Sequence, residues 1–379
     1  MHYLDHNASA PLRPEARLAM EETAAIAGNP SSVHAAGRAA RARLEDARER
    51  VAGLIGAAPE TILFTSGGTE SAALAMAQAA NGCTLVLTSA IEHPCVLENA
   101  KRGAIPMASL PVNADGRADL DALEVTLTDA PGPVFVALML ANNESGVVQP
   151  VDAAARLVHE HGGRIFCDAV QAAGKMPVDV EALGVDYLSL SAHKIGGPAG
   201  IGALYLRPGT PFVPLWGGGG QERRLRTGTE NRIGAAGFGA AAKAAGDRLG
   251  SERARIAALR ERLESRLHAI APDLHIFGEA VERLPNTTLF AVPGRRAETL
   301  VMQFDLAGVC VSSGSACSSG KVEPSHVVAA MTDDPALARA AIRVSLGWNS
   351  SEADVDAFLS AAEHIFAGSR AGMVAEGRS

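Results

Sequence analysis

Short apolar runs alternate with helical stretches from residue 61 to residue 206, and this alternation restricts the possible fold more than any other feature. The runs are Thr61–Thr65, Thr84–Thr88, Val134–Leu140, Arg164–Asp168, Asp186–Ser191 and Ala203–Leu206. They contain successive Val, Ile, Leu or Phe residues, as do strands that are buried on both faces. Stretches of helical periodicity, such as Glu70–Ala80 and Asp152–His161, lie between them. We therefore predict an α/β fold with a mostly parallel sheet between helices.

The pattern changes after residue 250. One apolar stripe of a long helix consists of Ile256, Leu259, Leu263, Leu267 and Ile270. Shorter elements follow, at Thr287–Val292 and Ala338–Leu346. We therefore assign residues 13–249 to a large domain, and residues 1–12 together with 250–379 to a smaller α+β domain.

Composition excludes several classes of protein. The formal net charge is −8, which argues against a general nucleic-acid binder, because phosphate contacts need clustered Lys and Arg. We find neither a signal peptide nor an apolar run long enough to span a membrane. The five cysteines are irregularly spaced and form no disulfide framework or CxxC metal pair. We therefore expect a cytoplasmic protein without a metal, in which most cysteines are small core residues.

Three polar residues follow the ends of predicted strands, where ligands of parallel sheets bind. Lys194 ends Ser-Ala-His-Lys after one strand, and Asp168 and Gln171 lie in Asp-Ala-Val-Gln after another. Alone, Lys194 would be interpreted as an exposed loop lysine. A carboxylate beside it can pair with a pyridinium nitrogen, and Gln171 can reach the same ring. Together they meet the requirements of a pyridoxal-phosphate site.

Other polar positions fit the same interpretation. The Gly-Gly turn at Phe64–Ser71 precedes a helix and could bind a phosphate, although such turns are often only tight connections. His93 in Glu-His-Pro could stack on a flat ring or simply cap a helix. Asn142 and Asn143 follow a buried strand, where a ligand would be one way to satisfy their amides. Arg343, in an apolar run, could bind a carboxylate or form a structural ion pair.

Cys317 lies in a small, polar, glycine-containing segment, Ser-Ser-Gly-Ser-Ala-Cys-Ser-Ser-Gly-Lys. Such a composition predicts a mobile loop rather than a core position. The thiol is therefore either incidental or a nucleophile that must move, and nearby Lys321 could favour its thiolate.

Taken together, these motifs resemble the cysteine desulfurases. The set comprises Thr-Ser-Gly-Gly-Thr-Glu-Ser, Glu-His-Pro, Asn-Asn-Glu, Asp-Ala-Val-Gln, Ser-Ala-His-Lys, Arg-Thr-Gly-Thr-Glu-Asn and Ser-Ser-Gly-Ser-Ala-Cys. These enzymes are class V aminotransferases of pyridoxal-phosphate (PLP) fold type I, and the long-loop group of iron–sulfur and nitrogenase cluster assembly is the most similar. The resemblance runs from Tyr3 to about Asp356. It implies a mostly parallel seven-stranded sheet and a homodimer.

The resemblance also implies a role for each motif residue. Lys194 would form the covalent bond to PLP, Asp168 would pair with the ring nitrogen, Gln171 would bond the ring hydroxyl, and His93 would stack on the ring and act as an acid–base group. Gly68, Thr69, Ser191 and His193 would hold the phosphate, and Thr229 would reach the phosphate in the partner subunit. Asn143 would contact cofactor and substrate, Arg343 would bind the substrate carboxylate, and Cys317 would attack the substrate sulfur.

The implied reaction converts L-cysteine into L-alanine and leaves a persulfide on Cys317, which passes to a sulfur acceptor such as an iron–sulfur scaffold protein. A selenocysteine lyase or another class V aminotransferase is the alternative enzyme. A transaminase needs no mobile cysteine, so the Cys317 segment argues against it, whereas selenocysteine lysis uses similar residues. A non-catalytic homologue is disfavoured because Lys194, Asp168, His93 and Cys317 are all present.

Overall fold

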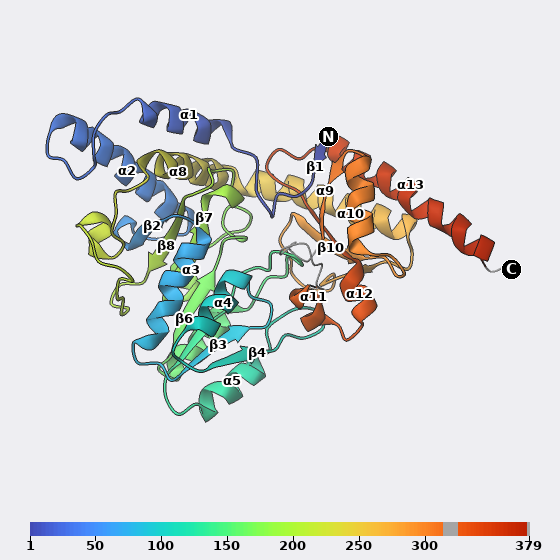
Figure 1. Cartoon of the computed structure of the whole chain (residues 1–379), viewed down its shortest axis with the longest axis horizontal. Coiled ribbons are helices and arrows are strands. Elements are labelled where there is room, and N and C mark those ends of the chain that lie inside the picture. Colours follow the sequence, from blue (N-terminus) through green and yellow to red (C-terminus); the bar gives the residue numbers. More distant parts are fainter. Residues whose placement is uncertain (314–324, 377–379) are drawn as a thin grey trace.

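A seven-stranded sheet forms the centre of the larger part of the molecule (Figure 1). The computed structural model describes residues 1–313 and 325–376. The strands are β2 (Ile62–Thr65), β3 (Leu85–Ser89), β4 (Met107–Leu110), β5 (Val134–Ala137), β6 (Arg164–Asp168), β7 (Tyr187–Ser191) and β8 (Gly202–Leu206), in the order β2-β8-β7-β6-β5-β3-β4. Only β8 runs antiparallel to its neighbours; all other pairs are parallel. The predicted mostly parallel sheet is thus confirmed.

All six predicted apolar runs contain a strand, but two details differ. The seventh strand, β4, has no apolar run in the sequence because only its last residue is buried and Ser109 is exposed, whereas β2 at the other edge is buried throughout. The run at Val134–Leu140 is longer than β5, which ends at Ala137. Beyond that point the backbone N–H groups of Leu138 and Leu140 still donate to the carbonyls of Phe166 and Asp168. The chain therefore stays beside β6 up to the edge where polar residues begin.

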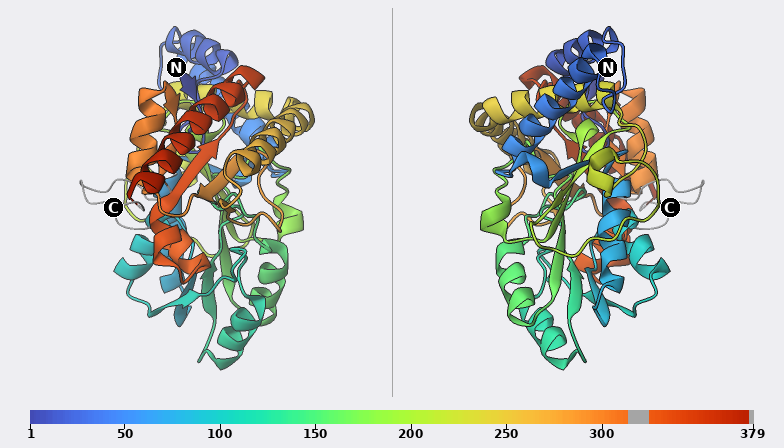
Figure 2. Two further views of the ribbon diagram at one scale, coloured as in Figure 1. Left: turned by 90° about the vertical axis from the view of Figure 1, so that its right-hand side faces the viewer. Right: turned by 90° about the vertical axis from the view of Figure 1, so that its left-hand side faces the viewer.

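Helices cover both faces of this sheet (Figures 1 and 2). They are α1 (Pro14–Ala24), α2 (Ala35–Leu54), α3 (Gly68–Met76), α4 (Pro94–Arg102), α5 (Leu120–Asp129), α6 (Val151–Glu160), α7 (Val180–Leu183) and α8 (Arg232–Asp247), with short 3₁₀ turns at Pro59–Thr61, Ala77–Ala80, Ala192–Lys194 and Gln221–Arg224. Successive strand residues enter opposite cores: Val136 joins the cluster of α2, α6 and α8, whereas Phe135 joins that of α3 and α4. Burial on both faces explains why the strands are continuous apolar runs.

A four-stranded antiparallel sheet forms the second, smaller part (Figure 1). Its elements are α9 (Leu249–Ile270), β9 (His275–Ile276), β10 (Thr287–Ala291), α10 (Ala297–Leu306), β11 (Val309–Cys310), β12 (Ser312–Ser313), α11 (His326–Met331), α12 (Pro335–Ala340), β13 (Ala341–Ser345) and α13 (Glu352–Glu376), and β1 (His2–Tyr3) pairs in parallel with β11. The predicted apolar stripe of α9 is buried from Ile256 to Leu267, and Ile270 packs partly buried beside it. The helix begins earlier than the stripe, at Leu249.

The predicted element at Ala338–Leu346 is two elements, the end of α12 and then β13. The division into residues 13–249 and the remainder stays a prediction. Within residues 1–313 and 325–376, none of the helices combines the length and the apolar character that crossing a membrane requires.

Candidate active site

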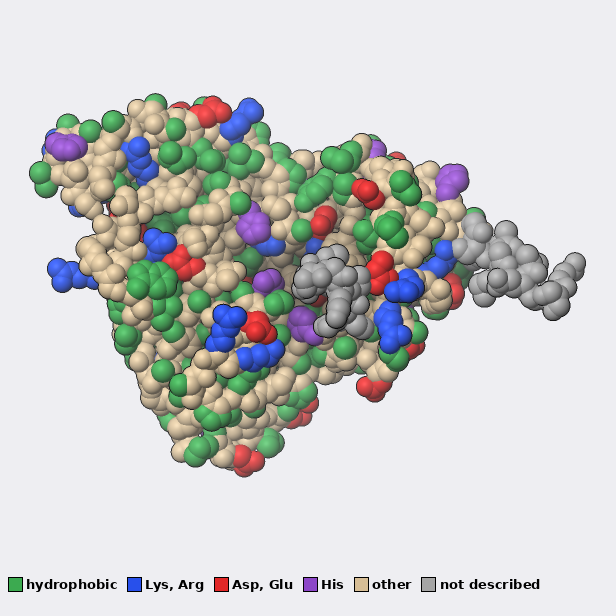
Figure 3. Space-filling view, viewed as in Figure 1, with side chains coloured by type: hydrophobic (Ala, Val, Ile, Leu, Met, Phe, Trp, Pro, Cys, Tyr) green, Lys and Arg blue, Asp and Glu red, His purple; other side chains and the backbone are tan. Residues whose placement is uncertain are grey.

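A cavity of about 580 Å³ lies at the carboxyl edge of the seven-stranded sheet. Its walls come from the ends of β6 and β7, the first turns of α3 and α4, the N-terminal segment at Asn7 and Ala8, and residues of the four-stranded part, including Ser325 and Arg343. On the face shown in Figure 3, several histidine side chains gather around the middle of the molecule. The cavity brings together ten of the predicted site residues: Gly68, Thr69, His93, Asn143, Asp168, Gln171, Ser191, His193, Lys194 and Arg343.

Lys194 ends the short 3₁₀ turn that follows β7, and its side chain enters the cavity. Its Nζ donates to the backbone carbonyls of Asn7 at 2.6 Å and Ala8 at 2.9 Å. Burial, reinforced by the charge of Arg343, lowers the pKa of Lys194 to about 8. An amine that loses its proton so readily is a good nucleophile near neutral pH. The interpretation as an exposed loop lysine is therefore wrong.

Asp168, the last residue of β6, is almost completely buried. Its Oδ1 accepts hydrogen bonds from the N–H of Val170 at 3.0 Å and the hydroxyl of Ser189 at 2.9 Å. Both donors fix the position of this carboxyl group. Within the part of the chain that the structure describes, Oδ2 has no hydrogen-bond partner, so it remains able to bind a cation in the cavity.

A cradle suited to an anion lies between β7 and the first turn of α3. The first N–H groups of α3, which starts at Gly68, have no acceptor within the helix and carry the positive end of its dipole. A Cβ at Gly68 would lie 3.0 Å from Cγ2 of Val170 and 3.7 Å from Cβ of Ser191. Glycine therefore leaves room for a ligand's oxygens beside the backbone. Burial, followed by the charges of Lys194 and Lys175, lowers the pKa of nearby His193 to about 4, so this imidazole is neutral.

His93 caps the N-terminus of α4, where its Nδ1 accepts from the N–H of Cys95 at 3.1 Å. The capping role that the sequence left open is therefore real, and His93 also lines the cavity. Burial lowers its pKa, so a neutral ring predominates at neutral pH. Because Nδ1 accepts, the proton of the neutral ring is on Nε2.

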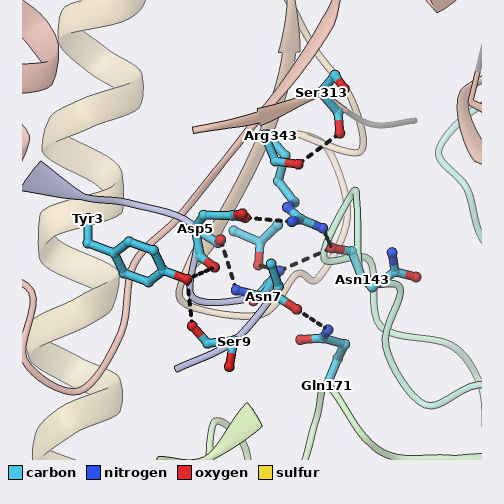
Figure 4. Close-up of polar contacts among 12 residues, drawn as sticks. Tyr3, Asp5, Asn7, Ser9, Asn143, Gln171, Ser313 and Arg343 are labelled. Carbon is cyan, nitrogen blue, oxygen red and sulfur yellow. Dashed lines mark hydrogen bonds and ion pairs between the residues drawn. The ribbon is translucent and has the colours of Figure 1, made fainter. Parts of the chain in front are cut away.

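Arg343 combines both interpretations of the sequence, since it lines the cavity and also forms an ion pair. Its Nη2 lies 2.6 Å from Oδ1 of Asp5, and Nη1 donates to the carbonyl of Asn143 at 3.0 Å (Figure 4). Among the described residues its buried Nε has no acceptor. The guanidinium is thus held in a fixed position, and each Nη carries a second N–H that can donate to a carboxylate in the cavity.

Several cavity residues were missed by the sequence analysis. Asn7 is fully buried, and it bonds to Gln171 and Asn143 of the seven-stranded part (Figure 4) and to Thr287 of the four-stranded part. Burial raises the pKa of Glu144, which accepts a hydrogen bond from Ser325, to about 7. Cys95, expected to be a core thiol, is half-buried on the cavity wall with its Sγ 3.0 Å from Nδ1 of His93. The Glu-His-Pro motif beside it was the available signal.

Two of the predicted residues that the structure describes do not contribute a side chain to this cavity. Asn142 is satisfied within the protein: its Nδ2 donates to Ile91, and its Oδ1 accepts from two backbone N–H groups. Thr229 is exposed and does not line the cavity, so its proposed action in a partner subunit stays a prediction. Cys317 and Lys321 lie outside the described residues.

The comparisons with known proteins agree with this geometry. The chain matches the family described as aminotransferase class-V over residues 2–358. It therefore belongs to that family. A cysteine desulfurase of Cereibacter sphaeroides is 45% identical, with 94% of this chain and 93% of that protein covered. An IscS-like cysteine desulfurase of Mycobacterium tuberculosis is 40% identical, with 95% and 94% covered.

The fold agrees as well. A NifS-like protein from Rickettsia africae superimposes with a TM-score of 0.90 at 34% identity, covering 97% of this chain and 99% of that one. Within the class-V family, the chain accordingly groups with the cysteine desulfurases. The resemblance stated from the motifs alone is confirmed.

Proposed function

We propose that this chain is a PLP-dependent cysteine desulfurase that converts L-cysteine into L-alanine and retains the sulfur as a persulfide on Cys317. The observation that carries the proposal is one cavity containing a buried lysine of lowered pKa, a buried carboxylate and a fixed arginine. Selenocysteine lysis and other class-V aminotransferase reactions are not favoured, because the similar proteins named above are cysteine desulfurases.

The residues present fit PLP, the cofactor that the family implies. The cradle at Gly68, Thr69, Ser191 and His193 would hold its phosphate. Asp168 would pair with the ring nitrogen through Oδ2, and Lys194 would form the covalent bond. When bound, PLP supplies an acceptor for the electrons that the substrate's Cα releases.

The chain's own residues would perform the remaining steps. Arg343 binds the substrate carboxylate, and Asn143 lies beside it. The Lys194 amine, once displaced by the substrate's amine, moves the proton at Cα, which its low pKa permits. The neutral His93 ring can donate the proton on its Nε2, because its Nδ1 is engaged by the N–H of Cys95.

Sulfur removal would rest on Cys317. Its thiolate attacks the substrate sulfur, so an S–S bond forms while the Cβ–S bond breaks and its electron pair stays with the carbon fragment. Protonation of that fragment gives alanine, and the balance is cysteine plus thiol to alanine plus persulfide. Ser313 and Ser325, the described residues on either side of this segment, both line the cavity. This placement supports the assignment.

We further propose a cytoplasmic homodimer in which Thr229 reaches the partner's phosphate cradle, and a sulfur-acceptor protein such as an iron–sulfur scaffold. Exposure of Thr229 outside the cavity of its own chain supports the first of these proposals.

A single substitution tests the proposed function. Cys317→Ser should still bind PLP and still change its absorbance when cysteine is added. It should form no persulfide, and alanine output should fall about 10³-fold, because a hydroxyl at neutral pH is a poor nucleophile toward sulfur. Alanine release and persulfide are measured on the parent protein, on Cys317→Ser, and on Cys310→Ser as a matched control whose half-buried thiol lies outside the cavity. Near-normal alanine output from Cys317→Ser would refute the assigned nucleophile.

A further inference from the structure

A second lysine, Lys175, lies next to the predicted cofactor residues but does not line the main cavity. It follows the turn after β6, and its Nζ donates to Oε1 of Gln171 at 2.6 Å and to Oδ1 of Asn7 at 2.9 Å. Among the described residues, no carboxylate forms an ion pair with it. A partly buried lysine without a carboxylate partner is unfavourable for stability, so its presence calls for another explanation.

The two contacts determine which way two amide side chains face. Amide oxygens accept and amide nitrogens donate, so an amine that donates to an amide selects its oxygen. Gln171 therefore directs Oε1 toward Lys175 and Nε2 toward the Asn7 carbonyl, which lies 2.9 Å away and can only accept (Figure 4). Asn7 directs Oδ1 toward both Lys175 and the donating Nδ2 of Asn286, while its own Nδ2 donates to the carbonyl of Asn143 at 3.1 Å.

This arrangement leaves one donor for a ligand. Gln171 lines the cavity, and the second N–H of its Nε2 has no acceptor among the described residues. If the Gln171 amide turned over, its oxygen would face the Asn7 carbonyl and repel it, and the Lys175 amine would lose one of its two acceptors. The orientation holds whether or not Lys175 is protonated, since a neutral amine retains two N–H groups for its two acceptors. Burial, together with the charges of Lys194 and Arg343, lowers the pKa of Lys175 well below its usual range.

We propose that Lys175 is a positioning residue for the cofactor, which acts through Gln171 by keeping the amide N–H group of that side chain directed into the cavity. The inference rests on the proposed function, because it concerns the donor that Gln171 offers to the ring oxygen of PLP. It assigns Lys175 no contact with the cofactor. Lys175 and Gln171 should therefore behave as one unit toward PLP.

The test is a double-mutant cycle on cofactor binding. PLP is titrated into apo forms of the parent protein, Lys175→Met, Gln171→Ala and the double variant, and both Kd and the wavelength of the visible absorbance maximum are measured. We expect Lys175→Met to raise the Kd about tenfold, as loss of about one oriented hydrogen bond would, and to shift the maximum. In the Gln171→Ala background the same change should add little, because coupled residues are not additive.

Controls separate this role from a purely structural one. Lys243→Met removes an exposed lysine that pairs with Asp247 and should leave Kd and spectrum unchanged. If Lys175→Met does not fold, as judged by thermal unfolding of the apo protein, Lys175→Gln retains an amide group that can still donate and should give a smaller shift in the same direction. A parent-like Kd and spectrum in the variant that folds, or full additivity with Gln171→Ala, would overturn the inference. A parent protein that itself binds no PLP and makes no alanine would instead overturn the proposed function.

Discussion

The two walls of the cavity are built differently. On the seven-stranded side, Asp168 ends one strand and Lys194 ends the short turn after the next, and Asp168 is held by donors only two residues away and on the adjacent strand. On the four-stranded side, Arg343 depends on Asp5 and Asn143, which are 338 and 200 residues distant in sequence. The first wall is therefore set by one sheet, whereas the second exists only where separate parts of the chain meet. This contrast suggests that the first wall serves the cofactor and the second serves the substrate.

The largest effect should come from the cofactor wall. Lys194→Ala removes the amine that would bond PLP and move the substrate proton, so alanine formation should fall by at least about 10³-fold. The visible absorbance of covalently bound cofactor should also disappear. Alanine release and the absorption spectrum measure both, with Lys243→Ala as an exposed control. Turnover retained in Lys194→Ala would contradict the assignment of the seven-stranded wall to the cofactor.

A smaller, separable effect is expected at the substrate wall. Arg343→Lys keeps the charge but cannot contact Asp5, Asn143 and a substrate carboxylate at once, because lysine lacks the planar fork. Loss of one charged hydrogen bond, worth about 1.5–3 kcal/mol, should raise KM for cysteine roughly 10- to 100-fold. The Kd for PLP should hardly change. Steady-state kinetics measures KM and a PLP titration measures Kd. If Arg343→Lys raised KM for cysteine and Kd for PLP equally, the two walls would not bind substrate and cofactor separately.

The smallest effect concerns stability, at the junction of the two walls. Burial raises the pKa of Glu144 from 4.5 to about 7 in the folded protein. Between these values the folded state holds a proton that the unfolded state releases, so this group makes stability fall as pH rises from about 4.5 to 7. Glu144→Gln removes the titration. Between pH 5 and pH 8, the free energy of unfolding of the variant should rise by about 1–3 kcal/mol relative to that of the parent.

Denaturant unfolding of the apo protein at the two pH values measures this difference. Glu92, whose pKa is raised to about 8 by burial and by Asp168, titrates in both proteins and so does not affect their comparison. Ser325→Ala, which removes the donor to Glu144, provides a second variant that keeps the carboxyl group. An identical pH dependence in parent and Glu144→Gln would show that Glu144 is not a buried carboxyl.

The same contrast explains what could be predicted from sequence. Residues at the ends of parallel strands, such as Asp168 and Lys194, were found because strand periodicity locates the ends and parallel strands share one functional edge. β4 was missed because it is only partly buried, and its exposed Ser109 interrupts any apolar run. Asp5 and Lys175 were missed for another reason. Their significance lies in partners such as Arg343 and Asn7, which only the tertiary structure brings near.

The N-terminal segment has a consequence for how the protein is made. β1 pairs with β11, the N–H of Asn7 donates to Oγ of Ser345, and Asp5 forms a bridge with the same residue. Residues 2–7 therefore leave the ribosome long before residues 309–345, with which they pair. Contacts of such sequence separation form slowly, because loop closure must be completed before they contribute. The seven-stranded sheet can assemble earlier during synthesis, so the Arg343 side of the cavity should be completed among the last steps of folding.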